Sequence, residues 1–245
     1  VGANGRGAAY GVLELSRMAG VSPWIWWGDL VPEKRDRLTI DSNFKTTQGA
    51  SVEYRGIFLN DEDWTTRPWS YGNYEPSGFG YIGAKTYKRI FQLLMRLRAN
   101  AIWPAMHEGT VAFFNVEGAK AVADSCGIVI GTSHCEPLLR NNVGEWDVKK
   151  RGRFNYITNK EGVQAYWAER LREVSKSGNN MFTIGMRGIH DGSMEGVKTM
   201  DENFEALKHV IADQQVLLKK YVGDPAEQTP VFVPYKEVLE IYERG

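Results

Sequence analysis

The sequence predicts an α/β protein, and more closely a (β/α)8 TIM-like barrel of which about the first five βα units are present. Five short runs are apolar at consecutive positions, which is typical of parallel strands covered on both faces. Stretches with a helical period separate them. Each run ends on a polar residue or is directly followed by one, and a barrel draws its functional groups from many strand ends, whereas an open sheet concentrates them at one switch point.

Residues 1–45 differ from the remainder and are interpreted as the end of an N-terminal α/β domain with its linker. They contain a short helical period that closes on Gly20, followed by the tryptophan-rich stretch "SPWIWWGDLVP" and the charged "EKRDR". Residues 46–245 are interpreted as the partial catalytic barrel.

The five expected strands occur at intervals along residues 46–245. In order they are "YRGIFLND" (54–61), "AIWPAM" (101–106), "IVIGTSH" (128–134), "FTIGMR" (182–187) and "VFVPYKE" (231–237).

Four helices are expected between and around these strands, each with an apolar stripe at helical spacing. The stripes are Tyr87, Ile90, Phe91, Leu94 and Leu97; Ala119, Val122, Ala123 and Cys126; Val163, Tyr166, Trp167, Leu171 and Val174; and Leu207, Val210, Ile211, Leu218 and Tyr221. Gly127 is expected to end the second helix and Gly223 the fourth. A capping box from Thr158 to Glu161 is expected to begin the third.

Composition and charge exclude several classes of function. Thirty basic residues balance thirty acidic ones, so no net charge attracts nucleic acid or an anionic membrane. No apolar stretch is long enough to span a bilayer. The two cysteines, Cys126 and Cys135, flank an extended run that holds them too far apart for a disulfide, so both are expected to be free thiols. The glycine-rich "GANGRG" follows no visible strand and is weak evidence for nucleotide binding.

Groups able to do chemistry stand at or just after the strand ends. They are Asp61, His107, His134, Arg187, Asp191 and Glu237. Each alone is explained at least as well as part of a turn, a cap or a structural contact, with a structural role favoured for His134, but the carboxyl ends of parallel strands converge on one rim. Such a set suits either glycoside hydrolysis by a carboxylate pair or a metal-dependent barrel hydrolase. No His-x-His or His-Glu-x-x-His spacing is present, which favours the glycosidase and predicts no metal and no cofactor.

The strand ends also resemble a known family. The blocks "YRGIFLNDED", "NAIWPAMHEG", "GTSHCEPLLRNN", "TIGMRG" and "PYKEV" are similar to conserved blocks of glycoside hydrolase family 115, the xylan α-1,2-glucuronidases. The opening "RGAAYGVLELSRMAGVSPWIWW" resembles the end of the α/β domain that precedes the barrel in that family.

The resemblance implies an inverting, exo-acting enzyme that removes glucuronic acid or its 4-O-methyl form from xylan. Glu237 falls on the position of the general acid, and Asp191 falls on an essential carboxylate that is the candidate for activating water. The substrate-binding candidates are Asp61, His134, Arg187, His107 and Lys236, with the Arg187 guanidinium suited to a bidentate pair with the uronate carboxylate. An inverting mechanism requires the Glu237 and Asp191 carboxyl groups to lie roughly 6.5–9.5 Å apart, and the acid to have a raised pKa.

The family also has further barrel strands and C-terminal domains, so this chain is expected to be a fragment with little or no activity alone. The expected partners are glucuronoxylan or its oligosaccharides, with no nucleic acid or membrane partner. A homodimer through the C-terminal domains and a secreted or periplasmic location complete these expectations. Two alternatives stay open: a metal-dependent barrel hydrolase with His134 and Asp191 as ligands, and a truncated, non-catalytic barrel that binds acidic glycans.

Overall fold

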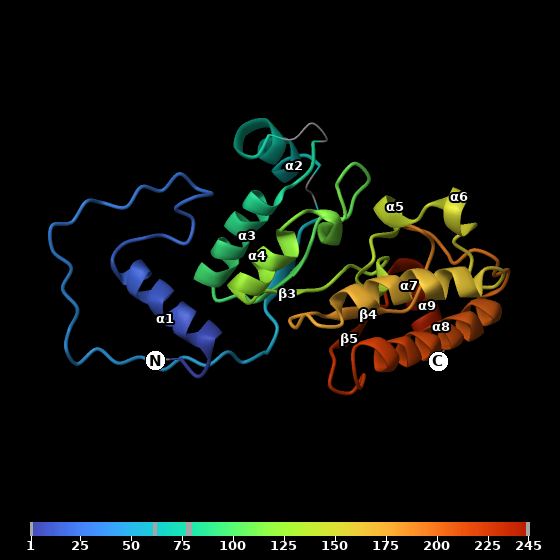
Figure 1. Cartoon of the computed structure of the whole chain (residues 1–245). Coiled ribbons are helices and arrows are strands. Elements are labelled where there is room, and N and C mark those ends of the chain that lie inside the picture. Colours follow the sequence, from blue (N-terminus) through green and yellow to red (C-terminus); the bar gives the residue numbers. More distant parts are fainter. Residues whose placement is uncertain (1, 61–62, 77–79, 244–245) are drawn as a thin grey trace.

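The structure is a computed structural model, and it describes residues 2–60, 63–76 and 80–243, without the side chain of Glu237. Its elements alternate between helices and short parallel strands, as Figure 1 shows. The expected α/β class is therefore confirmed.

The strands run parallel and neighbour one another in chain order. They are β1 (Gly56–Phe58), β2 (Ala101–Trp103), β3 (Val129–Ile130), β4 (Phe182–Ile184) and β5 (Pro230–Phe232). One sheet has the order β1-β2-β3 and the other pairs β4 with β5. An isolated parallel bridge between Ile130 and Asn180 joins β3 to the residues just before β4. Four of the strands lie within the predicted runs and β5 begins one residue early, at Pro230, and all are shorter than those runs.

The described residues form longer helices and short helical segments of three to five residues. The longer ones are α1 (Gly5–Met18), α3 (Ala84–Arg96), α4 (Ala119–Cys126), α7 (Lys160–Val174) and α8 (Met200–Tyr221). The short ones are α2 (Thr66–Trp69), η1 (Ser70–Tyr74), η2 (Phe113–Asn115), η3 (Pro137–Leu139), α5 (Asn142–Glu145), α6 (Val148–Arg151), η4 (Lys236–Val238) and α9 (Leu239–Tyr242).

The four expected helices correspond to α3, α4, α7 and α8. In α3 the predicted stripe is buried as far as Leu94, whereas Leu97 lies just past the helix end and is 48% exposed. Gly127 ends α4 with a left-handed φ of 63°, as predicted.

The predicted capping box at the start of α7 is wrong. The N-cap is Asn159, and no side chain caps this end. Thr158 lies in the preceding turn, where its backbone N–H donates to Asn155 Oδ1 at 3.0 Å. A capping box occurs instead at α8, where the Glu202 N–H donates to Thr199 Oγ1 at 3.2 Å and the Glu202 side chain accepts from the Thr199 N–H.

Two large hydrophobic cores support the sheets, and a smaller cluster of Leu207, Val238 and Ile241 packs against Phe232 of β5. One lies around β1, β2 and β3 under α3 and α4, and the other lies between β4, α7 and α8. In Figure 1, α3 and α4 lie side by side beside β3, and α7 and α8 lie beside β4 and β5. The half-buried ring of Phe114 packs against both cores and therefore joins them.

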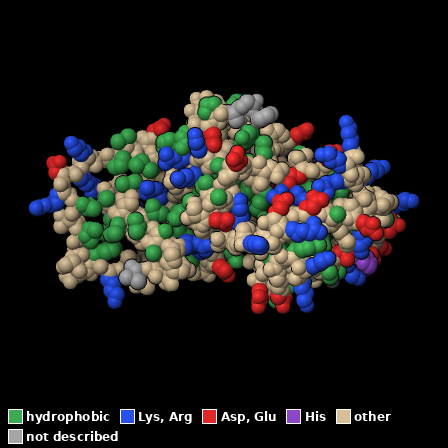
Figure 2. Space-filling view, in the orientation of Figure 1, with side chains coloured by type: hydrophobic (Ala, Val, Ile, Leu, Met, Phe, Trp, Pro, Cys, Tyr) green, Lys and Arg blue, Asp and Glu red, His purple; other side chains and the backbone are tan. Residues whose placement is uncertain are grey.

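The N-terminal segment packs on the outside of the first core. Its helix α1 is held by the Tyr10 hydroxyl, which donates to Ala99 O at 2.9 Å, and by an ion pair between Arg98 and Glu14 at 2.8 Å. Residues 19–55 form no further helix or strand. Hydrophobic side chains gather on the face of this part of the molecule that Figure 2 shows. The exposed hydrophobic side chains of the segment include Val12, Trp24 and Val31.

Two smaller expectations are also settled. Cys126 and Cys135 are free thiols, as predicted. Across the described part of the chain, no helix combines the length and the apolar character needed to cross a membrane.

Candidate active site

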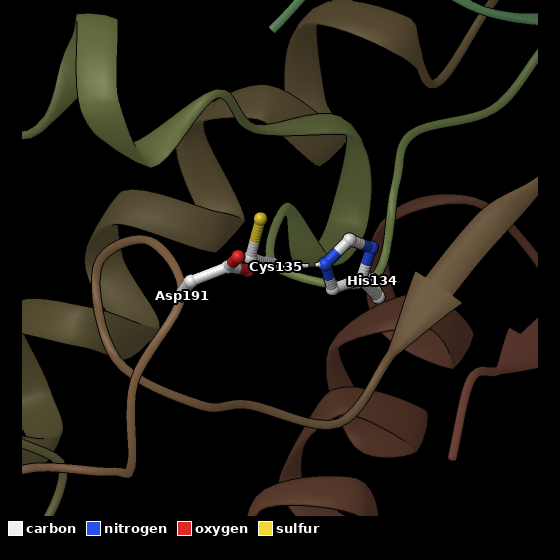
Figure 3. A group of neighbouring side chains, drawn as sticks. All are labelled: His134, Cys135 and Asp191. Carbon is white, nitrogen blue, oxygen red and sulfur yellow. Dashed lines mark hydrogen bonds and ion pairs between the residues drawn. The ribbon is translucent and has the colours of Figure 1, made fainter. Parts of the chain in front are cut away.

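The structure brings four of the predicted residues together beyond the carboxyl ends of β3, β4 and β5. His134 follows β3, Arg187 and Asp191 follow β4, and Lys236 follows β5. Because parallel strands direct their carboxyl ends to one edge, three short loops meet at this point. Figure 3 shows His134 and Asp191 facing one another there.

The Asp191 carboxylate is the centre of this cluster. Lys236 Nζ donates to Asp191 Oδ2 at 2.5 Å, His134 Nε2 lies 3.4 Å from Oδ1, and Arg187 lies 3.5 Å from the same oxygen. The hydrogen bond from Lys236 is the main reason that the pKa of Asp191 is lowered to about 2; partial burial opposes this shift, and His134 and Arg187 reinforce it. Asp191 is therefore ionised near neutral pH, and its low pKa makes it a weak base while Lys236 holds it.

His134 is held as a neutral imidazole. Burial lowers its pKa below the ordinary value, and the neighbouring Arg187 cation lowers it further. Its ring meets the Tyr235 ring edge-on, with centroids 4.8 Å apart. A carboxylate only accepts hydrogen bonds, so the Nε2 atom that faces Asp191 carries the proton.

The two cations differ in their surroundings. The Arg187 side chain is 1% exposed and therefore sits in a fixed position under the cluster, whereas Lys236 reaches Asp191 from the surface. Lys236 also has a φ of 50°, in the left-handed region that residues with a Cβ rarely adopt. Such backbone strain is common at functional sites.

His107 belongs to a second cluster beside the first. Its Nδ1 lies 3.0 Å from Asp63 Oδ2, and Arg67 Nε lies 3.1 Å from Asp63 Oδ1. The His107 ring lies 6.3 Å from that of His190, the neighbour of Asp191 in the chain. Asp63, His190 and Tyr235 are not among the predicted site residues, although Asp63 stands in the acidic "DED" after β1 and Tyr235 in "PYKEV".

Two predicted residues remain untested. Asp61 and the side chain of Glu237 lie outside the described residues. The backbone of Glu237 belongs to η4, directly after Lys236. The expected separation of the Glu237 and Asp191 carboxyl groups therefore stays a prediction.

The donor atoms of His134, Cys135 and Asp191 all lie within 4.8 Å of one another, which raises the question of a metal (Figure 3). Burial raises the pKa of Cys135 to about 11, so its thiol holds its proton. Lys236 and Arg187 already place positive charge on Asp191. A metal ligand set needs deprotonated donors free of competing cations, so these residues fit a metal ion poorly.

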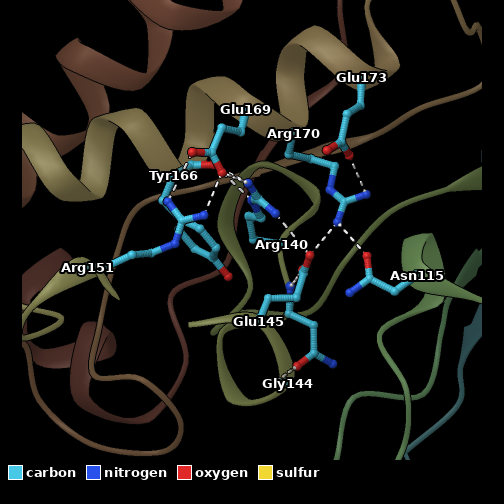
Figure 4. A network of polar contacts seen from close by, with 10 residues as sticks. Asn115, Arg140, Gly144, Glu145, Arg151, Tyr166, Glu169, Arg170 and Glu173 are labelled. Carbon is cyan, nitrogen blue, oxygen red and sulfur yellow. Dashed lines mark hydrogen bonds and ion pairs between the residues drawn. The ribbon is translucent and has the colours of Figure 1, made fainter. Parts of the chain in front are cut away.

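A buried polar framework supports the loop that carries His134. The Ser133 N–H and hydroxyl both donate to Glu136 Oε2, at 3.2 and 3.0 Å. Further along, Glu145 accepts from Arg140 at 2.9 Å and also pairs with Arg170 (Figure 4). The loop is thus fixed by charge-assisted hydrogen bonds to α5 and α7.

Comparison with known proteins identifies the family. The model of Glycosyl hydrolase family 115 matches residues 47–245. Among solved structures, the chain is similar to one described as "A novel family GH115 4-O-Methyl-alpha-glucuronidase, BtGH115A, with specificity for decorated arabinogalactans". The sequences are 50% identical and the TM-score is 0.94, over 100% of this chain and 32% of that one, so this chain spans about a third of its length. A search of curated protein sequences gave no match. On this evidence the chain belongs to glycoside hydrolase family 115.

Proposed function

We propose that this chain forms part of the active site of an inverting α-glucuronidase that removes glucuronic acid or 4-O-methylglucuronic acid from a polysaccharide. The observation that carries the proposal is the ionised Asp191, held between Lys236, His134 and Arg187. Membership of family 115 and the similarity to a 4-O-methyl-α-glucuronidase support the same reaction.

In the proposed mechanism, Asp191 accepts a proton from a water molecule whose oxygen attacks the anomeric carbon. The glycosidic bond breaks, and its oxygen takes a proton from the Glu237 carboxyl group, so the sugar leaves with inverted configuration. A carboxylate with a pKa of about 2 is a weak base. A substrate carboxylate that draws the exposed Lys236 away would raise the pKa of Asp191 and strengthen it as a base.

The cations of the cluster suit an acidic sugar. Arg187 is rigid and its side chain is 1% exposed, so a bidentate pair with a uronate carboxylate requires the side chains that cover it to move, whereas Lys236 offers its charge at the surface. His134, His107 and Asp61 are then left to contact sugar hydroxyls. Local charge, on a chain whose net charge is zero, accounts for selectivity toward uronates.

The polymer has two candidates. The sequence resemblance favours glucuronoxylan or its oligosaccharides, whereas the similar solved structure is described as specific for decorated arabinogalactans. Both polymers lie outside the cell, so the proposed location is secreted or periplasmic.

The remaining proposals concern architecture. The parallel strands, neighbours in chain order, support a (β/α)8 barrel of which these are the first five strands. Residues 1–45 are proposed as the end of the preceding α/β domain. A homodimer through domains outside this chain is likewise a proposal.

The test is the release of 4-O-methylglucuronic acid from glucuronoxylan and from decorated arabinogalactan by the full-length protein, with this chain alone measured in parallel. Proton NMR should show the β-anomer as the first product. Asp191→Asn and Glu237→Gln should each lower kcat by several orders of magnitude, and EDTA should have no effect. A first-formed α-anomer, full activity in Glu237→Gln or loss of activity with EDTA would contradict the mechanism.

A further inference from the structure

We propose that Gln214 of α8 is a positioning residue, which fixes the turn at Gly185 and thereby places Arg187 and Asp191 in the candidate active site. Gln214 is completely buried. Its side-chain amide makes two hydrogen bonds to one residue: Oε1 accepts from the Gly185 N–H at 2.7 Å, and Nε2 donates to Gly185 O at 2.9 Å.

Gly185 is the first residue after the end of strand β4. The pairing of β4 with β5 ends at Ile184 opposite Phe232. Buried backbone groups must find partners, and at Gly185 the Gln214 amide supplies both. The residue also has a φ of 95°, and a Cβ there would lie 3.1 Å from the Phe232 ring. Packing and hydrogen bonds together therefore set the direction in which the chain leaves β4.

The direction of the chain at Gly185 sets the positions of Arg187 and Asp191, because both residues follow within a short stretch. Arg187 is two residues beyond Gly185, within about 7 Å of chain. The loop that carries Asp191 is closed by the Gly188 N–H, which donates to Gly192 O at 2.8 Å. Because the loop is short and closed on itself, a shift at Gly185 moves it as a unit. Asp191 would then lose its geometry with Lys236 on the neighbouring strand end.

A buried glutamine that only satisfies its own polar atoms is the competing explanation, and an adjacent residue separates the two. Gln214→Leu removes both hydrogen bonds, while Gln215→Leu makes the same substitution at an exposed position of the same helix. The first measurement is the pKa of the Asp191 carboxyl by carbon-13 NMR. We expect Gln214→Leu to raise it from about 2 toward its ordinary value of 3.8, and Gln215→Leu to leave it unchanged.

Gln214→Glu provides a second test if the leucine variant does not fold. A glutamate keeps the acceptor for the Gly185 N–H but donates to Gly185 O only when protonated, and burial raises its pKa. We expect solvent exchange of the Gly188 N–H to be faster than in the wild type at a pH above the raised pKa of this glutamate, and the difference to shrink as the pH falls through that pKa. Exchange equal to that of the wild type at all pH values would overturn the proposal.

The activity measurement rests on the proposed function, whereas the NMR measurements do not. In the full-length enzyme, a displacement near 1 Å at Asp191 should lower kcat/KM by about a hundred-fold in Gln214→Leu, with little change in Gln215→Leu. If the Asp191 pKa moves but every form is inactive, the proposed function fails and the positioning role stands. If Gln214→Leu folds with the Asp191 pKa at its wild-type value, the positioning role fails whatever the activity.

Discussion

Asp191 illustrates how one side chain obtains its chemistry from its neighbours. An isolated aspartate beside water would titrate near 4. Here Lys236 is the strongest of three groups that favour the charged form, and together they outweigh the cost of partial burial. The carboxylate is therefore ionised but only weakly basic, and its basicity depends on which cation the substrate engages.

This shift in pKa makes stability depend on pH in a defined direction. A carboxyl group whose pKa is lower in the folded state stabilises the fold above its unfolded pKa, and the contribution is lost as the pH falls through the folded value. The wild type should therefore exceed Asp191→Asn in Tm above about pH 4, and the difference should vanish near pH 2. Thermal melts from pH 6 to 2 measure this.

Lys236→Met serves as the control for that experiment, since Lys236 is the largest cause of the shift. In the Lys236→Met background, the further change Asp191→Asn should lower Tm much less. A Tm difference between wild type and Asp191→Asn that grows as the solution becomes more acidic would contradict this account.

For the site residues, the sequence predicted the positions along the chain correctly, but it did not predict the contacts between their side chains. The strand-end rule located His134, Arg187 and Asp191 on neighbouring loops, and the structure brings His134 and Arg187 each within 3.5 Å of Asp191. It could not reveal that Asp63 binds His107, because that contact depends on the path of a loop. The positions of glycines and carboxylates along the chain do not determine the path that a loop takes.

Helices α7 and α8 show how far a local sequence pattern predicts a helix cap. Both have a threonine three residues before a glutamate, yet only Thr199 caps its helix. The Asn155 side chain accepts a hydrogen bond from the backbone N–H of Thr158. This bond holds Thr158 in a turn, so the helix begins after it. A sequence pattern alone cannot choose between a cap and a competing turn.

The difference between these two threonines predicts different costs on substitution. Thr199→Ala should lower the free energy of unfolding by about 1 kcal/mol, because it leaves a helix N–H without its acceptor. Thr158→Ala should change it by less than about 0.5 kcal/mol, as expected of an exposed position that makes no cap. Urea denaturation compares the two, and equal losses would contradict the assignment of the caps.

Buried ion pairs connect the loop after β3 to helix α7. Glu145 pairs with Arg140 and Arg170, and these three side chains are at most 6% exposed. Removing one partner of a buried pair leaves an uncompensated charge. Nothing in the local sequence indicated this network, since its members are up to 30 positions apart.

Glu145→Gln should therefore destabilise the fold by about 3 kcal/mol. Glu173→Gln is the matched control, because Glu173 also pairs with Arg170 but its side chain is 58% exposed, and its loss should cost less than about 1 kcal/mol. Chemical denaturation of both variants at the same pH measures the difference. Similar losses would show that the buried network contributes no more than a surface pair.

The stability of the whole molecule depends on the junction between its two larger cores. The sequence predicted the α/β class and all five strands, because apolar runs and helical stripes are local signals. It did not predict that the sheet narrows between β3 and β4 to a single bridge at Ile130 and Asn180. Phe114 contacts both cores at this junction, and Arg170 stacks 4.6 Å from its ring. Cooperativity between the halves is therefore expected to depend on this side chain.

Phe114→Ala tests this at the scale of the whole chain, beside Phe154→Ala, which removes a ring from one core only. Both should lower the free energy of unfolding, by about 2–4 kcal/mol for rings packed to this degree. Only Phe114→Ala should uncouple the cores, so that its fluorescence and circular dichroism transitions in urea separate and the m-value falls, while Phe154→Ala keeps one transition. Coincident transitions with an unchanged m-value in Phe114→Ala would show that the bridge and the surrounding hydrogen bonds couple the halves without the ring.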